Sequence, residues 1–349
     1  MNSKERIRSI LSFEIPEDRI GIFDGYWKAT QDRWHKEGLP ENMSADDYFE
    51  TEIRLIGFDF SFRFKEKLLE ETKEYKIYRT KEGITRKDLK KPDGYTPFWM
   101  DHAIKTEKDW YEVKERLFVS EDRVDWQEAF DKYKKYNEQG KFISVVTFFP
   151  YEATWPRLGQ ERVLTWMIEK PELIKDMFST HTELVIGMCE MMISKGLKFD
   201  GAVVAGDMAY RNGLLFSPRM YKELLFPFHK KIGDYFKQNN MPLIYHGCGN
   251  ITEVIPMLIE AGITCLQPLE VKAGMDVRDL KKQYDGQVIF MGNIDVRELS
   301  KTKKHIEEEI KKKIPVAKVG GGYIYHSDHS VPSTAVSYTH LTLPTILLV

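Results

Sequence analysis

The sequence predicts an α/β fold in which eight parallel strands and their helices form a (β/α)8 barrel, the TIM barrel architecture. From Phe142 onward, short apolar segments alternate with helical segments, which is typical of a parallel sheet covered by helices. Six such strands, together with two earlier candidates, make the eight that a barrel needs. The chain has 349 residues, and because a barrel requires about 250, there is room for insertions.

Each element of the barrel is predicted from a short apolar run or from a longer helical stretch between such runs. The predicted strands are 20–27, 53–60, 142–149, 202–205, 243–245, 264–269, 288–291 and 323–325. The predicted helices are 3–12, 30–36, 105–138, 159–195, 217–239, 251–261, 276–284 and 298–313. Residues 75–86 carry two charged strand candidates around a glycine turn, so we predict a hairpin insertion there, outside the core.

We expect residues 1–335 to form a single barrel domain with an N-terminal helical extension. Residues 336–349 are expected to be a non-native tail, because residues 336–345 match the translation of a common transposon-based sequencing adapter. We therefore exclude the tail from the fold. The strand at 323–325 is then followed by too little chain for its helix, so we expect the final helix of the barrel to be missing.

Composition excludes several classes of function. The net charge of −2 provides no electrostatic basis for binding nucleic acid or a membrane surface. Three cysteines do not form a disulfide framework, which favours a cytoplasmic location. The charged N-terminus lacks the apolar region of a signal peptide, and no apolar run is long enough to span a bilayer.

The stretch at residues 242–250 contains the most informative short motif. It reads as a buried strand that ends in a glycine-flanked loop, with His246 and Cys248 two positions apart. On a strand, two such side chains point to the same face. An imidazole and a thiol on one face are suitable for half of a zinc site. A cysteine that only fills space in the core would give the same short pattern.

Polar residues also follow the ends of the other late strands. In a barrel these ends meet at one face, where active sites are built. Any one of the polar residues alone reads as a cap or a turn, but five successive strands share the pattern. The residues concerned are Asp207, His246, Cys248, Glu270, Asn293, Asp295, His326, Asp328 and His329.

These segments resemble the uroporphyrinogen decarboxylase superfamily, whose members are (β/α)8 barrels and which includes the corrinoid-linked methyltransferases. The resemblance covers the chain up to about Ala335. Its motifs specify the superfamily better than the reaction. They lie at residues 206–218, 246–250, 270–276, 291–295 and 321–332.

The resemblance to the methyltransferases implies a zinc site. In those enzymes a His-x-Cys pair supplies two zinc ligands, and His246 and Cys248 match it. The third ligand is a cysteine after the last strand, and His329 stands at that position here. The decarboxylase itself has a functional histidine at this position, but it also has an arginine-rich segment after its first strand. In this chain that segment offers only Lys28 and Arg33.

We therefore expect zinc-dependent methyl transfer to or from a corrinoid carried by a partner protein, acting on a small-molecule substrate. The alternatives are decarboxylation of a tetrapyrrole or smaller carboxylate, as in porphyrin biosynthesis, and, from another class, a non-catalytic barrel that binds a ligand. The expected metal ligands are His246, Cys248 and His329. The expected catalytic residues are Asp207, Glu270 and His329. The expected substrate-binding residues are Tyr210, Arg211, Asn293, Asp295 and His326.

Overall fold

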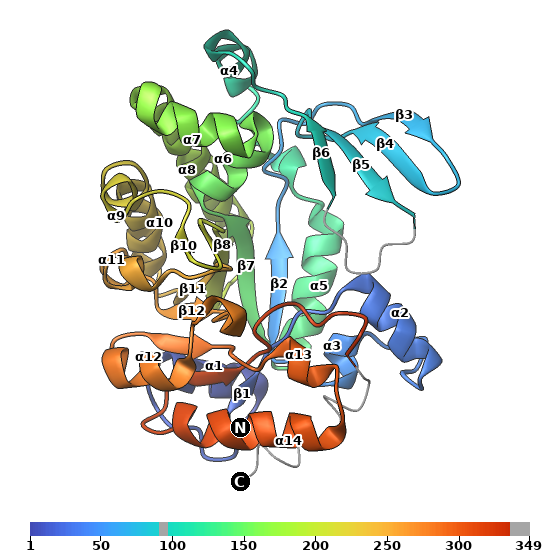
Figure 1. Cartoon of the computed structure of the whole chain (residues 1–349), viewed down its shortest axis with the longest axis vertical. Helices are drawn as coiled ribbons and strands as arrows, with labels where there is room; N and C mark the ends of the chain where they lie inside the picture. Colours follow the sequence, from blue (N-terminus) through green and yellow to red (C-terminus); the bar gives the residue numbers. More distant parts are fainter. Residues whose placement is uncertain (91–96, 336–349) are drawn as a thin grey trace.

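A computed structural model of the protein describes residues 1–90 and 97–335. Its centre is an eight-stranded parallel sheet in the order β1-β14-β13-β12-β11-β8-β7-β2, which confirms the predicted α/β barrel class (Figure 1). All eight predicted strands are present. They are β1 (Gly21–Ile22), β2 (Ile53–Gly57), β7 (Phe142–Phe148), β8 (Gly201–Ala205), β11 (Leu243–His246), β12 (Cys265–Gln267), β13 (Ile289–Met291) and β14 (Tyr323–Tyr325).

The two edge strands of this sheet, β1 and β2, are joined through the buried Glu52. The backbone N–H of Glu52 donates to the carbonyl oxygen of Ile22 at 2.9 Å, and the Glu52 carboxylate accepts the N–H of Ile22 at 2.7 Å. Arg6 and Arg19 form ion pairs with the same carboxylate. Because β1 is only two residues long, this side chain substitutes for part of the hydrogen-bond ladder that would otherwise join β1 to β2.

The amino-terminal helix α1 (Ser3–Leu11) packs on the apolar interior at the amino-terminal ends of the strands. Strand side chains alternate in direction, so every second residue points into the barrel. These inward residues and three residues of α1 form one buried cluster. Its members are Ile7, Ile10, Leu11, Ile53, Phe142, Val203, Ile244, Cys265, Ile289, Met291 and Ile324.

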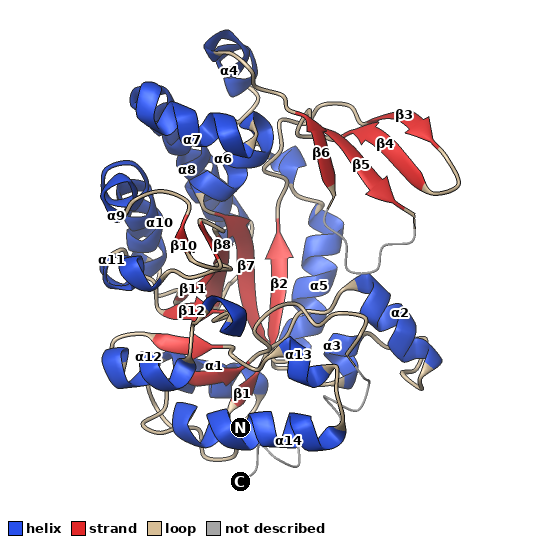
Figure 2. Ribbon diagram, viewed as in Figure 1, coloured by secondary structure: helices blue, strands red, loops and turns tan. Residues whose placement is uncertain are grey.

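Most of the other helices lie along the outside of the sheet (Figure 2). The single helix predicted over 105–138 is two helices in the structure. The helix predicted over 298–313 is preceded by a separate short helix. The helices are α2 (Lys28–Lys36), α3 (Ala45–Tyr48), α4 (Glu107–Lys114), α5 (Trp126–Glu138), α6 (Pro150–Leu158), α7 (Gln160–Glu169), α8 (Pro171–Ser194), α9 (Pro218–Met220), a π-helical turn (Tyr221–Leu225), α10 (Phe226–Gln238), α11 (Ile255–Glu260), α12 (Val277–Tyr284), α13 (Val296–Leu299) and α14 (Lys303–Ala317). Short 3-10 turns lie at Glu121–Arg123, Thr252–Val254 and Val271–Ala273.

The insertion is larger than the hairpin predicted at 75–86. It is a four-stranded antiparallel sheet of β3 (Lys67–Glu71), β4 (Tyr75–Arg79), β5 (Thr85–Leu89) and β6 (Phe98–Asp101), which stands beside α6 at the carboxyl-terminal side of the barrel (Figure 1). An ion pair of 2.7 Å between Arg157 and Glu82 and an edge contact between Trp99 and Trp155 attach it there. The outer strands β3 and β6 were missed because they expose most of their residues and lack an alternating apolar pattern.

After β14, residues 326–335 contain no helix. The predicted non-native tail at 336–349, and with it the question of a final helix, lies outside the described residues. In the described part of the chain, no helix combines the length and the apolar composition that crossing a bilayer would require.

Candidate functional site

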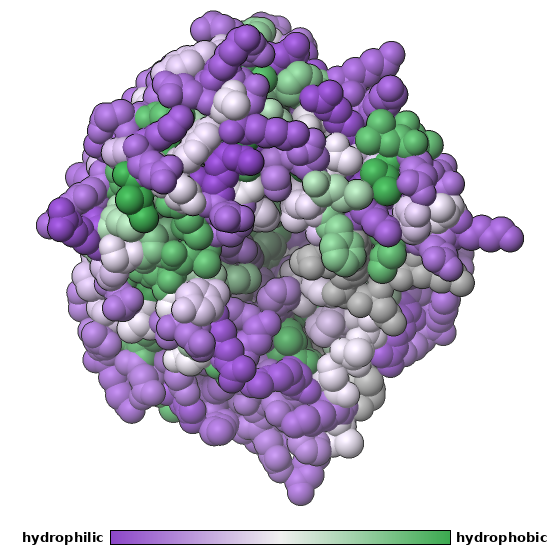
Figure 3. Space-filling view, turned by 45° about the horizontal axis from the view of Figure 1, so that its top comes forward, coloured by the Kyte–Doolittle hydropathy of each residue, from purple (hydrophilic) through white to green (hydrophobic). Residues whose placement is uncertain are grey.

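Three side chains suited to metal binding converge at the carboxyl-terminal rim of the barrel. His246 ends β11, Cys248 follows after one glycine, and Asp207 follows the neighbouring strand β8. The parallel register pairs His246 with Ala205, which brings the two strand ends together. One potential ligand atom from each of Asp207, His246 and Cys248 therefore lies within 4.8 Å of the others. Figure 3 brings this face forward and shows it hollowed near its centre.

The loop that carries Cys248 is held by carboxylates on both sides. The backbone N–H of Cys248 donates to Asp207 Oδ1 at 2.8 Å, and the N–H of Gly249 donates to Glu270 Oε2 at 2.8 Å. Gly249 has a φ of +85°, and a Cβ there would lie 2.7 Å from the backbone of the short hairpin formed by β9 (Ala209–Tyr210) and β10 (Gly213–Leu214). The glycine therefore lets the hairpin lie directly on the loop.

The charges around Cys248 favour a cation. Burial, together with the negative charges of Asp207 and Glu270, holds the pKa of the Cys248 thiol well above its usual range. Lys272 partly offsets this charge, but it is half-exposed and pairs with Glu270 at 2.7 Å. A divalent metal bound by Cys248 and Asp207 would supply the positive charge that the thiolate lacks.

Among the described residues, His329 does not join this group of three, and its expected role as the third ligand stays a prediction. Its ring lies edge-on to Trp27 with centroids 5.9 Å apart. The Ser327 hydroxyl bonds both the Asp24 carboxylate and the His329 carbonyl oxygen, and this turns the chain toward β1. Within the described residues, Asp207 completes the group of three instead.

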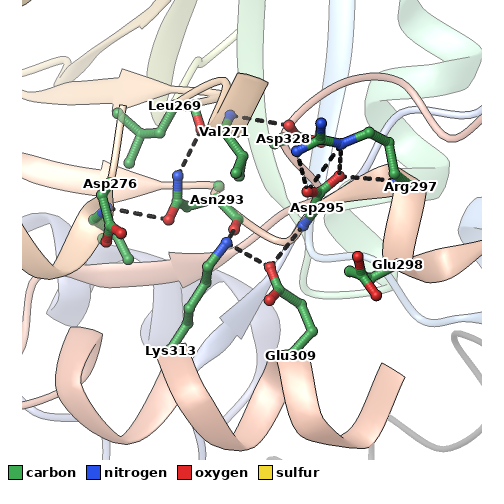
Figure 4. A network of polar contacts seen from close by, with 12 residues as sticks. Leu269, Val271, Asp276, Asn293, Asp295, Arg297, Glu298, Glu309, Lys313 and Asp328 are labelled. Atoms are coloured by element: carbon green, nitrogen blue, oxygen red, sulfur yellow. Dashed lines mark hydrogen bonds and ion pairs between the residues drawn. The ribbon is translucent and has the colours of Figure 1, made fainter. Parts of the chain in front are cut away.

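Asn293 lies in a network that stabilises the fold, and its expected contact with a substrate stays a prediction. It is fully buried. Its Nδ2 donates to the carbonyl oxygens of Leu269, at 2.8 Å, and Met275, and its Oδ1 accepts the N–H of Val277 at 3.1 Å. These bonds use both amide hydrogens and join the loop after β13 to the loop after β12 (Figure 4).

Asp295 belongs to the same network, in which it has a structural role, and its expected contact with a substrate stays a prediction. Its side chain caps α13 by accepting the N–H of Arg297 at 2.9 Å and forms an ion pair with that arginine. Nearby, Lys313 donates to the carbonyl oxygen of Asn293 at 2.6 Å and pairs with Glu309 (Figure 4). Asp328 accepts the N–H groups of Val271 and Val296, so it too ties loops together.

The remaining predicted residues lie around the metal cluster in different settings. Tyr210 and Arg211 are exposed on the β9–β10 hairpin, and the carbonyl oxygen of Tyr210 accepts the N–H of Asn250 at 2.9 Å. They are therefore free to contact a substrate entering from solvent. His326 is buried inside the barrel and contacts His246 only through Gln267, a residue that the sequence analysis did not select.

Glu152 is a second residue that was missed. It lies at the start of α6, directly after β7, and its carboxyl group accepts the indole N–H of Trp155 at 3.0 Å and the backbone N–H of Asp207. Burial, with a contribution from the charge of Asp207, raises its pKa to about 8. Applying the strand-end rule to the strand at 142–149 would have identified it. The site thus contains a carboxyl group that holds a proton at neutral pH beside a potential metal ligand.

A protein-family model described as Uroporphyrinogen decarboxylase (URO-D) matches residues 155–338, more than half of the chain. Among curated proteins, no significant sequence match is found.

Among solved structures, a methyltransferase from Methanosarcina mazei superposes with a TM-score of 0.70, covering 99% of this chain and 98% of that one at 16% identity. This likeness supports the fold. A β-glucosidase from Pyrococcus furiosus covers 90% of this chain and 87% of its own at 11% identity, but its TM-score is only 0.41.

Proposed function

The chain belongs to the uroporphyrinogen decarboxylase family, and from this premise we propose that it is a zinc-dependent methyltransferase that works with a corrinoid on a partner protein. The observation that carries the proposal is the convergence of Asp207, His246 and Cys248 within 4.8 Å at the rim of the barrel. A carboxylate, an imidazole and a thiolate are all established zinc ligands.

The residues present fit a zinc ion. Ligand atoms that surround zinc tetrahedrally at ~2.0–2.3 Å lie roughly 3.3–3.8 Å from one another. The three side chains therefore need to move only slightly from their present separation. Three protein ligands leave one coordination position open, which is the arrangement of catalytic rather than structural zinc sites. What a bound zinc ion supplies is Lewis acidity, which lowers the pKa of a coordinated thiol or polarises a carbon–oxygen bond.

The surrounding residues have distinct roles in this proposal. Glu270 holds the Cys248 loop through the N–H of Gly249, so the thiol stays at the rim. Glu152 holds a proton beside Asp207 and is suited to donate it to a leaving group. Tyr210 and Arg211 lie exposed on the hairpin above the loop, where a phenol and a guanidinium can orient an anionic substrate.

Decarboxylation of a tetrapyrrole or smaller carboxylate is the second candidate. One observation favours it: Glu152 and Asp207 form a pair of carboxyl groups, of which Glu152 keeps its proton at neutral pH. Such a pair handles protons without a metal. A non-catalytic barrel that binds a ligand is the third candidate, and it predicts neither metal-dependent nor metal-free turnover.

Metal content and turnover, measured together, separate the three candidates. We expect about one zinc ion per chain by elemental analysis. We also expect methyl transfer from methylcobalamin to a thiol, or from a methoxy compound to cob(I)alamin, that is lost on chelation and restored by zinc. Cys248→Ser should lose both properties and remain folded. Cys189→Ser, the same change on helix α8, is the matched control and should keep both.

Decarboxylation of uroporphyrinogen by zinc-free protein would favour the second candidate. Full turnover by zinc-free Cys248→Ser would exclude the metal mechanism, whereas zinc binding with full turnover by this variant would exclude Cys248 as a required ligand. The absence of both reactions would leave the ligand-binding barrel.

A further inference from the structure

A polar layer crosses the interior of the barrel directly above the apolar layer. The apolar layer includes Ile244, Cys265 and Ile324, which point inward from β11, β12 and β14. Two positions later, each of these strands presents a polar side chain to the same interior, because strand residues alternate in direction. These polar residues are His246, Gln267 and His326.

The three polar side chains form one continuous chain of hydrogen bonds. His246 Nδ1 lies 2.6 Å from Gln267 Oε1, and Gln267 Nε2 lies 2.8 Å from His326 Nε2. His326 Nδ1 in turn contacts the carbonyl oxygen of Ser327. Gln267 and His326 are 5% and 3% exposed, so bulk water does not compete for these bonds.

One group in this chain is chemically unambiguous, and with a neutral His326 ring it determines all the others. The carbonyl oxygen of Ser327 can only accept, so His326 Nδ1 must carry a hydrogen. The Asp24 carboxylate, 3.7 Å from the same nitrogen, favours the same assignment. In neutral His326 the other nitrogen, Nε2, is then an acceptor, and Gln267 must turn its NH₂ group toward it.

The orientation of Gln267 then decides the tautomer of His246. With its NH₂ group on His326, Gln267 presents its oxygen to His246, which must therefore donate from Nδ1. This leaves the lone pair on His246 Nε2, and only a nitrogen with a lone pair can bind a metal.

We propose that Gln267 and His326 are positioning residues that transmit the polarity of the Ser327 carbonyl to His246 and so select Nε2 as its metal-binding atom. The metal part of this inference rests on the proposed function, whereas the tautomer part concerns the metal-free protein. Partners of this kind orient a ligand and change metal affinity by 10–100-fold when they are removed.

The tautomer is measured directly by ¹⁵N NMR of metal-free protein labelled at histidine, with His246→Ala used to assign the signal. We expect a protonated Nδ1 and an unprotonated Nε2 for His246. The opposite tautomer, or rapid averaging of the two, would overturn the inference even if zinc binds. The predicted tautomer in a protein that binds no zinc would sustain it while refuting the proposed function.

Variants at Gln267 test its role as the acceptor of the His246 Nδ1 hydrogen, with the tautomer and the affinity for zinc as the two measurements. Gln267→Met keeps the length of the side chain but cannot accept, so His246 should average its tautomers and zinc affinity should fall 10–100-fold. Gln267→Glu still accepts from Nδ1 and should retain the tautomer and an affinity within a few-fold of wild type. Gln283→Met on α12 is the matched control and should change neither property. Wild-type tautomer and affinity in Gln267→Met would refute the role of this residue.

Discussion

The pH dependence of stability should reveal the buried carboxyl group of Glu152. Its pKa is raised from 4.5 to about 8, mainly by burial. Between these pH values the unfolded chain loses a proton that the folded protein keeps, so stability must fall as pH rises through this interval. One pKa unit corresponds to about 1.36 kcal/mol, which gives a loss on the order of 4 kcal/mol between pH 4.5 and pH 8.

The substitution Glu152→Gln removes this proton uptake and keeps the shape of the neutral acid. The amide oxygen can still accept the indole N–H of Trp155. In urea unfolding of metal-free protein, we expect the variant to match wild type near pH 4.5 and to be more stable by roughly 2–5 kcal/mol at pH 8.5. Glu161→Gln, an exposed position on the neighbouring α7, is the matched control and should show no such dependence. A Glu152→Gln variant that is less stable than wild type at pH 8.5, or equally stable at both pH values, would refute the reasoning.

The other predictions concern the metal cluster and the network behind it. Asp207→Asn should reduce zinc affinity and turnover at least tenfold, as measured by metal titration and by the activity assay. Its free energy of unfolding in urea should change by only about 1 kcal/mol, because the residue lies on a rim loop. Asn293→Ala should lower the free energy of unfolding by roughly 3 kcal/mol or more, because it leaves two carbonyl oxygens and one N–H without partners. Urea unfolding measures this loss, and Asn239→Ala at an exposed position is the control. Glu52→Ala should lower the free energy of unfolding by about 3–5 kcal/mol in the same assay, because it leaves Arg6 and Arg19 without their shared partner. A loss below about 1 kcal/mol would contradict the role of Glu52 in joining β1 to β2.

The strands could be predicted because each is a short apolar run that must be buried on both faces of a parallel sheet. β1 shows the limit of this rule. The apolar run at 20–27 predicts a long strand, but only Gly21–Ile22 pairs as one. Asp24 then turns aside to accept from Ser327 and the N–H of Gly25. Such a partner lies some 300 positions away in sequence and is visible only in the fold.

The candidate site could be predicted in part. His246 and Cys248 follow from their spacing, and Asp207 from its place after a strand. His329 was expected beside this pair, whereas the structure places its ring against Trp27, after a turn held by Ser327. Sequence position alone does not reveal such a turn.

Asn293 and Asp295 show a second reason why position after a strand does not by itself assign a role to a polar residue. Loops at strand ends need polar side chains to satisfy their backbone groups, and active sites need polar side chains at the same places. Asn293 bonds three backbone groups and Asp295 caps a helix. Gln267 shows the opposite case, because a residue within a strand contacts the site through the interior of the barrel.

The most direct test of the proposed function is the zinc coordination itself, measured by X-ray absorption at the zinc edge. For zinc-loaded wild-type protein, we predict one sulfur atom at ~2.3 Å and nitrogen or oxygen atoms at ~2.0–2.2 Å. In Cys248→Ser, the sulfur contribution should disappear, whereas in Cys189→Ser it should remain. A zinc environment without sulfur in wild type, or with its sulfur unchanged in Cys248→Ser, would contradict a metal centre built from Asp207, His246 and Cys248.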